Sequence, residues 1–324
     1  LLKFYVGGGN NGERIRKLML KREGWVETKD PTFVNFKWQQ TTRGYKYEEN
    51  TSYKQVVNHF EFHKEITNKQ YLVKNLMSFA ESMQNVFDIT PLTYVIDFIL
   101  NNFLKFFEMN MPYMWLLKPT FLNRGRGIHV FNSLASLEKA SQFVIQKYIE
   151  KPLLINKRKF DIRVWALVLI LFYYLFQIKR EGYMRLSSSE FSTDELDNLF
   201  IHLTNNAIQK YSDNYGQFEN GNMWSFQQLW EFLEANYQFK KKIVSKIKDI
   251  IWLTFCSVKK KINQYDRKFC FEIFGFDFLI DEELNSWLIE VNTNPAIDEC
   301  SQLLKTLIPR ALDDALKLTI DQIF

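Results

Sequence analysis

The stretch that decides the fold lies near the C-terminus, where residues 271–292 read FEIFGFDFLIDEELNSWLIEVN. Two apolar runs enclose a polar segment, and this pattern predicts a hairpin of two antiparallel strands. Successive side chains of a strand point to opposite faces, so Glu290 and Asn292, two residues apart, lie on the same side. Asp277 stands on the first strand, and we expect its carboxyl group to face the other two side chains.

Asp277, Glu290 and Asn292 would bring three hard oxygen donors together between apolar strands. Mg²⁺ in nucleotide sites takes carboxylate and carbonyl oxygens together with phosphates. Carboxylates buried without a cation would cost considerable free energy. We therefore interpret this set as a magnesium site, and a cluster of hydrogen-bonded polar side chains is the alternative.

Charged residues alternate with apolar ones further upstream, where residues 158–165 read RKFDIRVW. On a strand, Lys159, Asp161 and Arg163 share one face, and the apolar residues between them share the other. Three ionisable groups on one face of a buried strand are costly unless they are paired or bound to a ligand. A polyphosphate site is the favoured interpretation, and an internal Lys–Asp–Arg network is the alternative.

The longest apolar run of the chain continues this segment from Val164 to Phe176. Its 13 residues include two tyrosines. A membrane-spanning helix needs about 20 predominantly apolar residues, so we expect a buried strand here and no contact with a membrane.

Two segments before this strand have features of phosphate binding. Residues 115–119, WLLKP, predict a short strand with Lys118 near its end, and residues 144–149, VIQKYI, predict another. Between them, residues 123–128 read NRGRGI. Glycines let the backbone approach a ligand, successive N–H groups can form an anion nest, and arginines add charge-assisted contacts to phosphate. A plain hairpin turn is the alternative for this loop.

Residues 202–206, HLTNN, combine histidine, threonine and asparagine, whose side chains suit recognition through hydrogen bonds, and a plain turn is the alternative for this motif. Together the segments indicate one chemistry, in which lysines and a glycine loop hold phosphates and an Asp–Glu–Asn set holds Mg²⁺. Positive groups would neutralise charge on a transferring γ-phosphoryl group. Transfer to a carboxylate gives an acyl phosphate, which an amine can attack. Neither a Ser-His-Asp set nor a nucleophilic cysteine is indicated.

The N-terminal third has a different texture. Residues 4–22 predict a strand, a glycine-rich turn and a helix, and the turn has neither the P-loop spacing nor the G-x-G-x-x-G spacing. A structural turn is therefore favoured over a phosphate loop. His59 and His63 are four residues apart but lack a third ligand, so we do not interpret them as a metal site. Residues 71–115 predict mostly helix, including a second helix from Thr93 to Glu108.

A basic segment follows the HLTNN motif. Residues 236–268 hold ten Lys and Arg residues against two Asp residues, with apolar residues at helical spacing. We expect an amphipathic helix with a basic outer face. That face is either a solvated surface or a docking surface for an acidic partner, and the pattern leaves both open.

The composition is that of a globular chain, because 46% of the 324 residues are hydrophobic and 24% are charged. The net charge of +5, from 42 Lys and Arg against 37 Asp and Glu, is a weak indication of an acidic partner. Three cysteines without a CxxC motif predict reduced, intracellular thiols. The N-terminus has no apolar signal-peptide region, so we expect the cytosol, and it lacks an initiator Met, which is typical of a fragment.

In their order along the chain, these motifs resemble the tubulin–tyrosine ligase-like family over residues 113–309. Residues 5–12, 57–69 and 294–309 further resemble the elongating polyglycylase branch of that family. The motifs that carry the family resemblance are Lys118-Pro119, Arg124-Gly125-Arg126-Gly127-Ile128, Gln146-Lys147-Tyr148-Ile149, Lys159-Phe160-Asp161-Ile162-Arg163, His202-Leu203-Thr204-Asn205, Phe276-Asp277-Phe278 and Ile289-Glu290-Val291-Asn292-Thr293-Asn294-Pro295.

The resemblance implies an α/β (α+β) ATP-grasp fold with an N-terminal domain (1–70), a central domain (71–148) and a C-terminal ATP-grasp domain (149–324). ATP would lie between the last two. The implied ATP contacts are Lys118, Arg124, Gly125, Arg126, Gly127, Ile128, Gln146, Lys147, Tyr148, Ile149, Lys159 and Asp161. The implied magnesium ligands are Asp277, Glu290 and Asn292. The implied substrate contacts are Arg124, Arg163, His202, Thr204 and Asn205, and the implied catalytic residues are Lys159, Arg163 and Glu290.

The implied activity is that of an ATP-dependent polyglycylase, which joins glycine to glutamate side chains or growing glycine chains on the acidic tails of tubulin. The alternatives are a polyglutamylase that takes glutamate, a tyrosine ligase of the same family, or a microtubule-binding pseudoenzyme. We expect tubulin or microtubules and free glycine as partners, and neither nucleic acid nor a membrane. The expected location is the cytoplasm and cytoskeleton, with the cilium or axoneme in particular.

Overall fold

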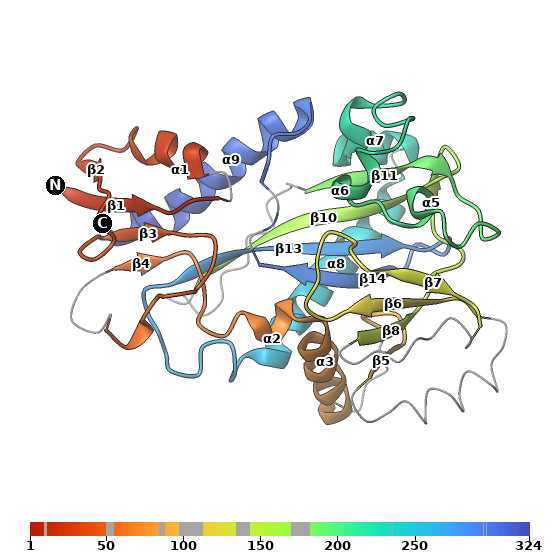
Figure 1. The fold of residues 1–324 in the computed structure, drawn as a ribbon, viewed down its shortest axis with the longest axis horizontal. Helices are drawn as coiled ribbons and strands as arrows, with labels where there is room; N and C mark the ends of the chain where they lie inside the picture. Colours follow the sequence, from red (N-terminus) through yellow and green to blue (C-terminus); the bar gives the residue numbers. More distant parts are fainter. Residues whose placement is uncertain are drawn as a thin grey trace.

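Three β-sheets organise the part of the chain that the structure describes (Figure 1). The computed structural model describes residues 1–9, 12–49, 55–83, 88–96, 113–133, 143–169, 182–234, 236–293, 295 and 297–324. The sheets follow one another along the sequence; the first is parallel, and the second and third are antiparallel. None of the helices in these ranges combines the length and the apolar character that a bilayer crossing requires.

The first sheet is parallel and has the strand order β2-β1-β3-β4. The predicted strand, turn and helix at the N-terminus are confirmed as β1 and α1, and residues 10 and 11 lie outside the described residues. Arg22, just beyond α1, forms ion pairs of 3.1 and 2.7 Å with Asp313 and Asp321 of the C-terminal helices, which fixes the two ends of the chain together. The elements of this region are β1 (Leu2–Val6), α1 (Gly12–Met19), β2 (Trp25–Glu27), β3 (Phe36–Trp38), η1 (Tyr47–Glu49), β4 (Val56–Val57), α9 (Gln302–Leu318) and α10 (Ile320–Ile323).

The second sheet is antiparallel and has the order β5-β8-β6-β7. Its strands are β5 (Thr93–Val95), β6 (Trp115–Pro119), β7 (His129–Phe131) and β8 (Phe143–Lys147), and the predicted strands over residues 115–119 and 144–149 are confirmed as β6 and β8. The predicted helix from Thr93 to Glu108 is wrong at its start, because Thr93 to Val95 pair with β8; residues 97–108 lie outside the described residues. Pairing with a distant strand overrode the helical spacing of the apolar residues.

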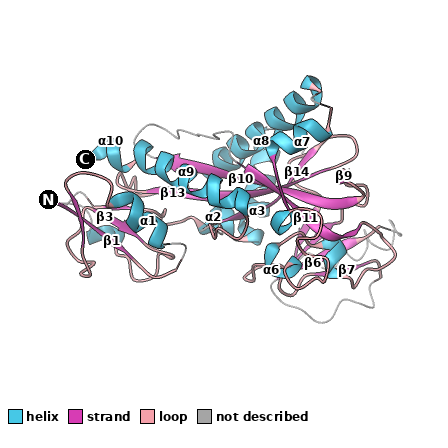
Figure 2. Cartoon of the chain, turned by 90° about the horizontal axis from the view of Figure 1, so that it is seen from above, coloured by secondary structure: helices cyan, strands magenta, loops and turns pink. Residues whose placement is uncertain are grey.

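The third sheet is the largest and has the order β12-β11-β10-β13-β14, with β9 on the end of β10. Its strands are β9 (Leu154–Ile155), β10 (Arg158–Leu169), β11 (Gly182–Glu190), β12 (Met223–Ser225), β13 (Phe271–Ile280) and β14 (Ser286–Asn292). The hairpin predicted over residues 271–292 is confirmed as β13 and β14. The apolar run is a buried strand as far as Leu169, and residues 170–176 lie outside the described residues. The long strands β10 and β13 extend from the side of the first sheet to the far side of the molecule (Figure 2).

One face of this sheet is apolar and packs against α8 (Tyr237–Val258). Phe255 of α8 meets Phe274 and Phe276 of β13 at ring distances of 5.5 and 5.8 Å. The predicted basic amphipathic helix is thus confirmed over α8, but it ends at Val258, and Ile262 stays buried through a turn. The remaining helices are short or lie at the edges: α2 (Lys64–Thr67), α3 (Lys69–Met83), α5 (Leu199–His202), α6 (Asn206–Gln209), η3 (Asn220–Asn222) and α7 (Phe226–Phe232).

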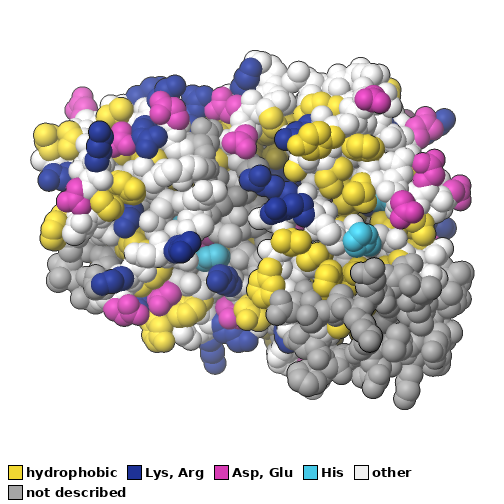
Figure 3. All heavy atoms as spheres, in the orientation of Figure 1, with side chains coloured by type: hydrophobic (Ala, Val, Ile, Leu, Met, Phe, Trp, Pro, Cys, Tyr) yellow, Lys and Arg dark blue, Asp and Glu magenta, His cyan; other side chains and the backbone are white. Residues whose placement is uncertain are grey.

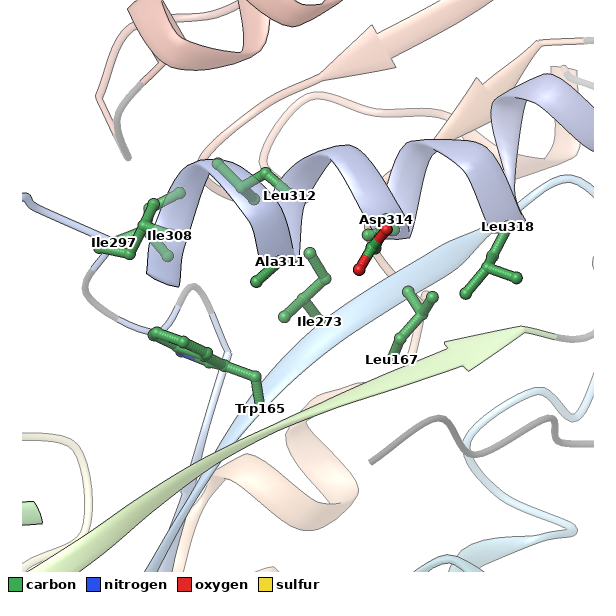
Figure 4. A pocket seen from close by; sticks show the side chains of 10 residues that line it. Trp165, Leu167, Ile273, Ile297, Ile308, Ala311, Leu312, Asp314 and Leu318 are labelled. Carbon is green, nitrogen blue, oxygen red and sulfur yellow. The ribbon is translucent and has the colours of Figure 1, made fainter. Parts of the chain in front are cut away.

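The opposite face of the sheet changes character along β10. Lys159, Asp161 and Arg163 lie on this face, and Trp165 and Leu167 continue it toward the first sheet. Helix α9 covers the apolar half, with its apolar side chains turned toward the sheet around a hollow of about 530 Å³ (Figure 4). Because α9 stops at that half, the charged half of β10 remains open to a ligand.

Candidate active site

A hollow of about 670 Å³ lies between the second and third sheets. It brings together side chains from β6, β8, β10, β13 and β14, which are distant in the sequence. Most of the predicted nucleotide and substrate residues line it: Lys118, Gly125, Ile128, Gln146, Lys147, Tyr148, Ile149, Lys159, Asp161, His202, Thr204, Asn205, Asp277 and Glu290. Seven dispersed motifs of the sequence therefore converge on one cavity.

Two lysines at this hollow are each only 4% exposed. The Lys118 ammonium donates to Gln146 Oε1 at 2.6 Å, and the Lys159 ammonium donates to the Tyr148 hydroxyl at 2.9 Å and to the His202 carbonyl at 3.0 Å. Within the described ranges, neither ammonium forms a salt bridge with a carboxylate. Burial lowers the pKa of Lys118 to about 8, and burial together with the nearby charge of Lys118 lowers the pKa of Lys159 to about 7. An anionic ligand such as a polyphosphate would supply the missing negative charge.

The buried ammonium of Lys159 should make the stability of the nucleotide-free chain depend on pH. Its pKa of about 7 lies below the ordinary value of 10.5, so the unfolded chain binds more protons between these two values. The destabilisation is complete below about pH 7 and disappears as the pH rises to 10.5. We expect Lys159→Met to be more stable than wild type at pH 7, with a difference that shrinks toward pH 10.5 in urea titrations. A difference that does not change with pH would contradict this.

Tyr148 and His202 hold Lys159 in place. The Tyr148 hydroxyl oxygen lies 2.8 Å from the His202 Nδ1 atom, and the His202 Nε2 atom lies 2.9 Å from the Glu195 carbonyl oxygen. Both ring nitrogens of His202 are therefore engaged within the chain, and the imidazole orients the tyrosine that bonds to Lys159. Contact of His202 with a substrate stays a prediction, and Thr204 and Asn205, which also line the hollow, are the better placed members of that motif.

Two arginines clamp the acidic residues on the charged face of the sheet. Arg163 forms a bidentate ion pair with Asp277, and Arg185 pairs with Asp161 and also reaches Asp277 Oδ2 at 2.9 Å. Burial alone would raise the pKa of Asp277, but the two guanidinium groups lower it well below the usual range. Asp161 and Arg163 of β10 thus pair with residues of the neighbouring strands β11 and β13 and not with each other. The sequence analysis missed Arg185, although it faces Asp161 across the β10–β11 ladder.

The predicted magnesium ligands lie together at the β13–β14 hairpin. The Asn292 amide nitrogen is 3.4 Å from Asp277 Oδ2 and 3.1 Å from Glu290 Oε1. The described residues hold no cluster of three or more His, Cys, Asp or Glu side chains suited to a metal ion. Two carboxylates and an amide oxygen nevertheless fit Mg²⁺, which keeps several waters and shares phosphate oxygens as ligands. Their role as ligands stays a prediction.

Lys69, at the start of α3, is a second residue that the sequence analysis missed. Its ammonium lies 3.8 Å from Glu290 Oε2 and donates to the Leu122 carbonyl at 2.8 Å. It thereby joins the β14 carboxylate to the chain just before the glycine loop. A single lysine at the start of a helix carries no local signal, so only the tertiary contact identifies it.

The glycine loop lies between the first hollow, which Gly125 and Ile128 line, and a second, neighbouring hollow of about 1490 Å³, which Arg124 lines. Gly125 adopts φ +76°, and a Cβ there would lie 2.4 Å from Ile208 Cδ1, so the position suits glycine. Of the predicted residues, Arg126 and Gly127 line neither hollow. The second hollow shares Arg185, Asn205 and Glu290 with the first. Figure 3 shows Lys and Arg side chains gathered near the middle of the face that is turned to the viewer. The predicted and basic residues that line the second hollow are Arg124, Arg163, Arg185, Lys210, Asn205, Glu290 and Asn292.

Gly275 of β13 lies opposite Trp165 of β10, and its Cα side faces the side chain of Arg163. A Cβ there would lie 2.7 Å from Pro295 Cβ and 3.3 Å from Arg163 Cδ. We expect Gly275→Ala to lower the free energy of unfolding by about 1–3 kcal/mol through overpacking. Chemical denaturation measures this. Gly8→Ala, where a Cβ would meet nothing within 4 Å, is the control, and equal effects in the two variants would contradict the prediction.

Comparison with known proteins gives a consistent picture. A sequence profile described as the Tubulin-tyrosine ligase family matches residues 47–323. Tubulin glycylase 3B of Tetrahymena thermophila is 38% identical over 216 residues, which cover 64% of this chain and 18% of that protein. Probable alpha-tubulin polyglutamylase Ttll1 of the same organism is 31% identical over 303 residues, which cover 82% of this chain and 72% of that protein. Probable tubulin polyglutamylase TTLL9 of Bos taurus is 29% identical over 357 residues, with 94% and 77% covered. The chain thus spans less than a fifth of the length of the glycylase.

Proposed function

Since this chain belongs to the tubulin-tyrosine ligase family, we propose that it is an ATP-dependent ligase that attaches amino acids to protein through peptide or isopeptide bonds. The single observation that carries the proposal is the pair of buried ammonium groups, Lys118 and Lys159, which face a hollow without a carboxylate partner. A triphosphate in that hollow would lie between the second and third sheets. This is the position expected for ATP in an ATP-grasp fold with the domains 1–70, 71–148 and 149–324.

In this proposal, different side chains of the protein have different roles in catalysis. Lys118 and Lys159 would neutralise the phosphates, and Arg163 would stabilise the charge of the transferring γ-phosphoryl group. Asp277, Glu290 and Asn292 would hold Mg²⁺, which when bound supplies charge neutralisation at the phosphate oxygens. A carboxylate oxygen attacks the γ-phosphorus and ADP leaves. The amine nitrogen of the second substrate attacks the acyl carbon of the resulting acyl phosphate, and inorganic phosphate leaves.

The basic hollow next to the nucleotide hollow favours an acidic protein as acceptor. Arg124 and Lys210 at this hollow would attract the acidic tails of tubulin by electrostatic complementarity. On helix α8, Lys242 and Lys246 are partly engaged within the chain, with the Glu283 carbonyl at 2.5 Å and the Asp88 carboxylate at 2.6 Å, so the α8 face is the weaker docking surface. We place the site of action at the cytoskeleton, with the cilium or axoneme as the specific location.

For the amino acid, we propose glycine, on the basis of the glycylase relatives that are 37–38% identical. Glutamate is the second candidate, because the polyglutamylase relatives match a larger share of this chain. Mass spectrometry of tubulin incubated with the chain, Mg²⁺ and ATP in the presence of glycine, glutamate or tyrosine separates the candidates. Addition of glycine alone is expected. Addition of glutamate alone would refute the glycylase assignment, and no ATP-dependent addition at all would refute the ligase proposal.

A further inference from the structure

A buried pair, His59 and Glu272, lies directly behind the end of strand β14. Each residue is 1% exposed, and His59 Nδ1 lies 3.0 Å from Glu272 Oε1. His59 belongs to the motif of His59 and His63, which has no role in the proposed chemistry. In the fold, His59 precedes α2 and does not lie on a helix, and its ring lies 5.9 Å from the ring of His63.

Both ring nitrogens of His59 face acceptors. Nδ1 meets the Glu272 carboxylate, and Nε2 lies 2.8 Å from the Gln39 carbonyl oxygen. The Asn58 amide nitrogen is 3.3 Å from Nε2, but it donates to the same Gln39 carbonyl at 3.0 Å. A carboxylate and a carbonyl only accept hydrogen bonds, so this geometry favours a proton on each nitrogen and a charged imidazolium. Burial alone would lower the pKa of His59, but the Glu272 carboxylate and the Gln39 carbonyl together raise it.

Glu272 ties three segments of the chain together. Its Oε1 atom accepts from His59 and from the Thr293 hydroxyl at 2.6 Å, and its Oε2 atom accepts from the Phe60 backbone N–H at 2.9 Å. Buried carboxylates with this many donors stay ionised and hold their partners firmly. The segment before α2, strand β13 and the end of β14 therefore share one buried charge pair.

Strand alternation links this pair to the active site. Thr293 directly follows Asn292, and adjacent side chains of a strand point to opposite faces. Asn292 pairs with Gly275 and faces Asp277 and Glu290, whereas the hydroxyl of Thr293 donates to Glu272, although both residues line the basic hollow. The hydrogen bond from Thr293 to Glu272 therefore restrains the end of β14 next to Asn292.

The same pair also holds the opposite rim of the basic hollow. His59 Nε2 bonds to the carbonyl of Gln39, and the next residues, Gln40 and Thr41, line that hollow together with Asn292 and Thr293. The two rims follow the first and third sheets, which are also joined two residues before His59 and Glu272, where Val57 and Cys270 form an isolated parallel bridge.

We propose that His59 and Glu272 are positioning residues, which act through Thr293 to fix Asn292 and Glu290 for binding of magnesium and nucleotide. This inference rests on the proposed function. The ligands concerned are a divalent cation and the phosphates of the nucleotide, and neither His59 nor Glu272 lines the two hollows in which they would bind. Residues that hydrogen-bond to metal-ligating side chains and orient them are typically needed for full metal affinity.

Thr293→Val tests the proposal, because it removes the hydroxyl and keeps the shape of the side chain. We expect backbone amides of residues 286–293 in the nucleotide-free chain to exchange hydrogen about tenfold faster, as one hydrogen bond to a charged group is lost. We expect the affinity for ATP with Mg²⁺, measured by isothermal titration, to fall about tenfold. Thr293→Ser, which keeps the hydroxyl, should restore both values.

Thr254→Val is the matched control. Thr254 is fully buried in α8, and its hydroxyl donates within the helix to the Ile250 carbonyl at 2.8 Å. Wild-type exchange and affinity in this variant would support the proposal. Equal changes in both Val variants, or unchanged exchange and affinity in Thr293→Val, would overturn it. Failure of the wild-type chain to bind ATP with Mg²⁺ would overturn the proposed function, and the exchange data would still decide whether the pair fixes β14.

Discussion

Replacing Glu290 with Gln is expected to reduce ligase turnover by at least about 100-fold while the chain keeps its fold. Gln preserves the volume and one oxygen but removes the negative charge that would hold Mg²⁺. The local contacts are tolerant of this change, because Glu290 receives a hydrogen bond from Asn292 at 3.1 Å and lies 3.8 Å from the Lys69 ammonium. The Glu290 side chain is 19% exposed, and the Lys69 ammonium keeps its hydrogen bond to the Leu122 carbonyl when the carboxylate is replaced.

The measurement for Glu290→Gln is the rate of amino-acid addition to tubulin at saturating ATP, followed by mass spectrometry. Glu282→Gln, in the exposed turn of the same hairpin, is the matched control and should turn over like wild type, since the Glu282 side chain is 55% exposed and pairs with the exposed Lys151. Thermal unfolding of both variants should match wild type within a few degrees. Wild-type turnover in Glu290→Gln would refute the assignment of Glu290 as a metal ligand.

The second large effect is expected for Lys159→Met. Methionine matches the length of the lysine stem but offers phosphates no hydrogen-bond donor and no charge. Loss of a buried charge-assisted contact should weaken ATP binding by about 100-fold. The nucleotide-free chain should at the same time gain stability at pH 7, because a buried ammonium that lacks a carboxylate partner is removed.

This opposite pair of effects separates a binding residue from a merely structural one. A structural lysine would lose stability on substitution, whereas Lys159→Met should lose nucleotide affinity and gain stability. Lys151→Met is the control, because the Lys151 side chain is 76% exposed, and it should leave both quantities unchanged. ATP titration calorimetry and urea denaturation measure the two effects. Unchanged ATP affinity in Lys159→Met would contradict the placement of the phosphates.

Strand positions were predictable where a short-range pattern exists. Alternation along residues 158–165 and 271–292 correctly placed three charges on one face of β10 and brought Asp277 toward Glu290 and Asn292. The helix expected from Thr93 failed at its start, because three residues there pair with β8 and the Thr93 hydroxyl accepts from Gln146 at 2.9 Å. Apolar spacing alone does not distinguish a short buried strand from a helix.

The partners of the charged residues were not predictable in the same way. Arg185 reaches Asp161 across 24 residues and Lys69 reaches Glu290 across more than 200, and neither pair has a local pattern. His59 illustrates this most clearly, since its carboxylate partner Glu272 lies 213 residues later.

The sequence by itself determined which side chains share a strand face, where the hairpin lies and which residue types offer phosphate and magnesium chemistry. The tertiary structure alone decided that Asp277 is held by two arginines, that His202 orients Tyr148, and that a buried His59–Glu272 pair stands behind Asn292. The physical reason is how far apart along the sequence the interacting groups lie. Side-chain alternation is set by the dihedral angles of neighbouring residues, whereas a charge pair forms between whichever groups the packing of separate sheets brings within a few ångströms.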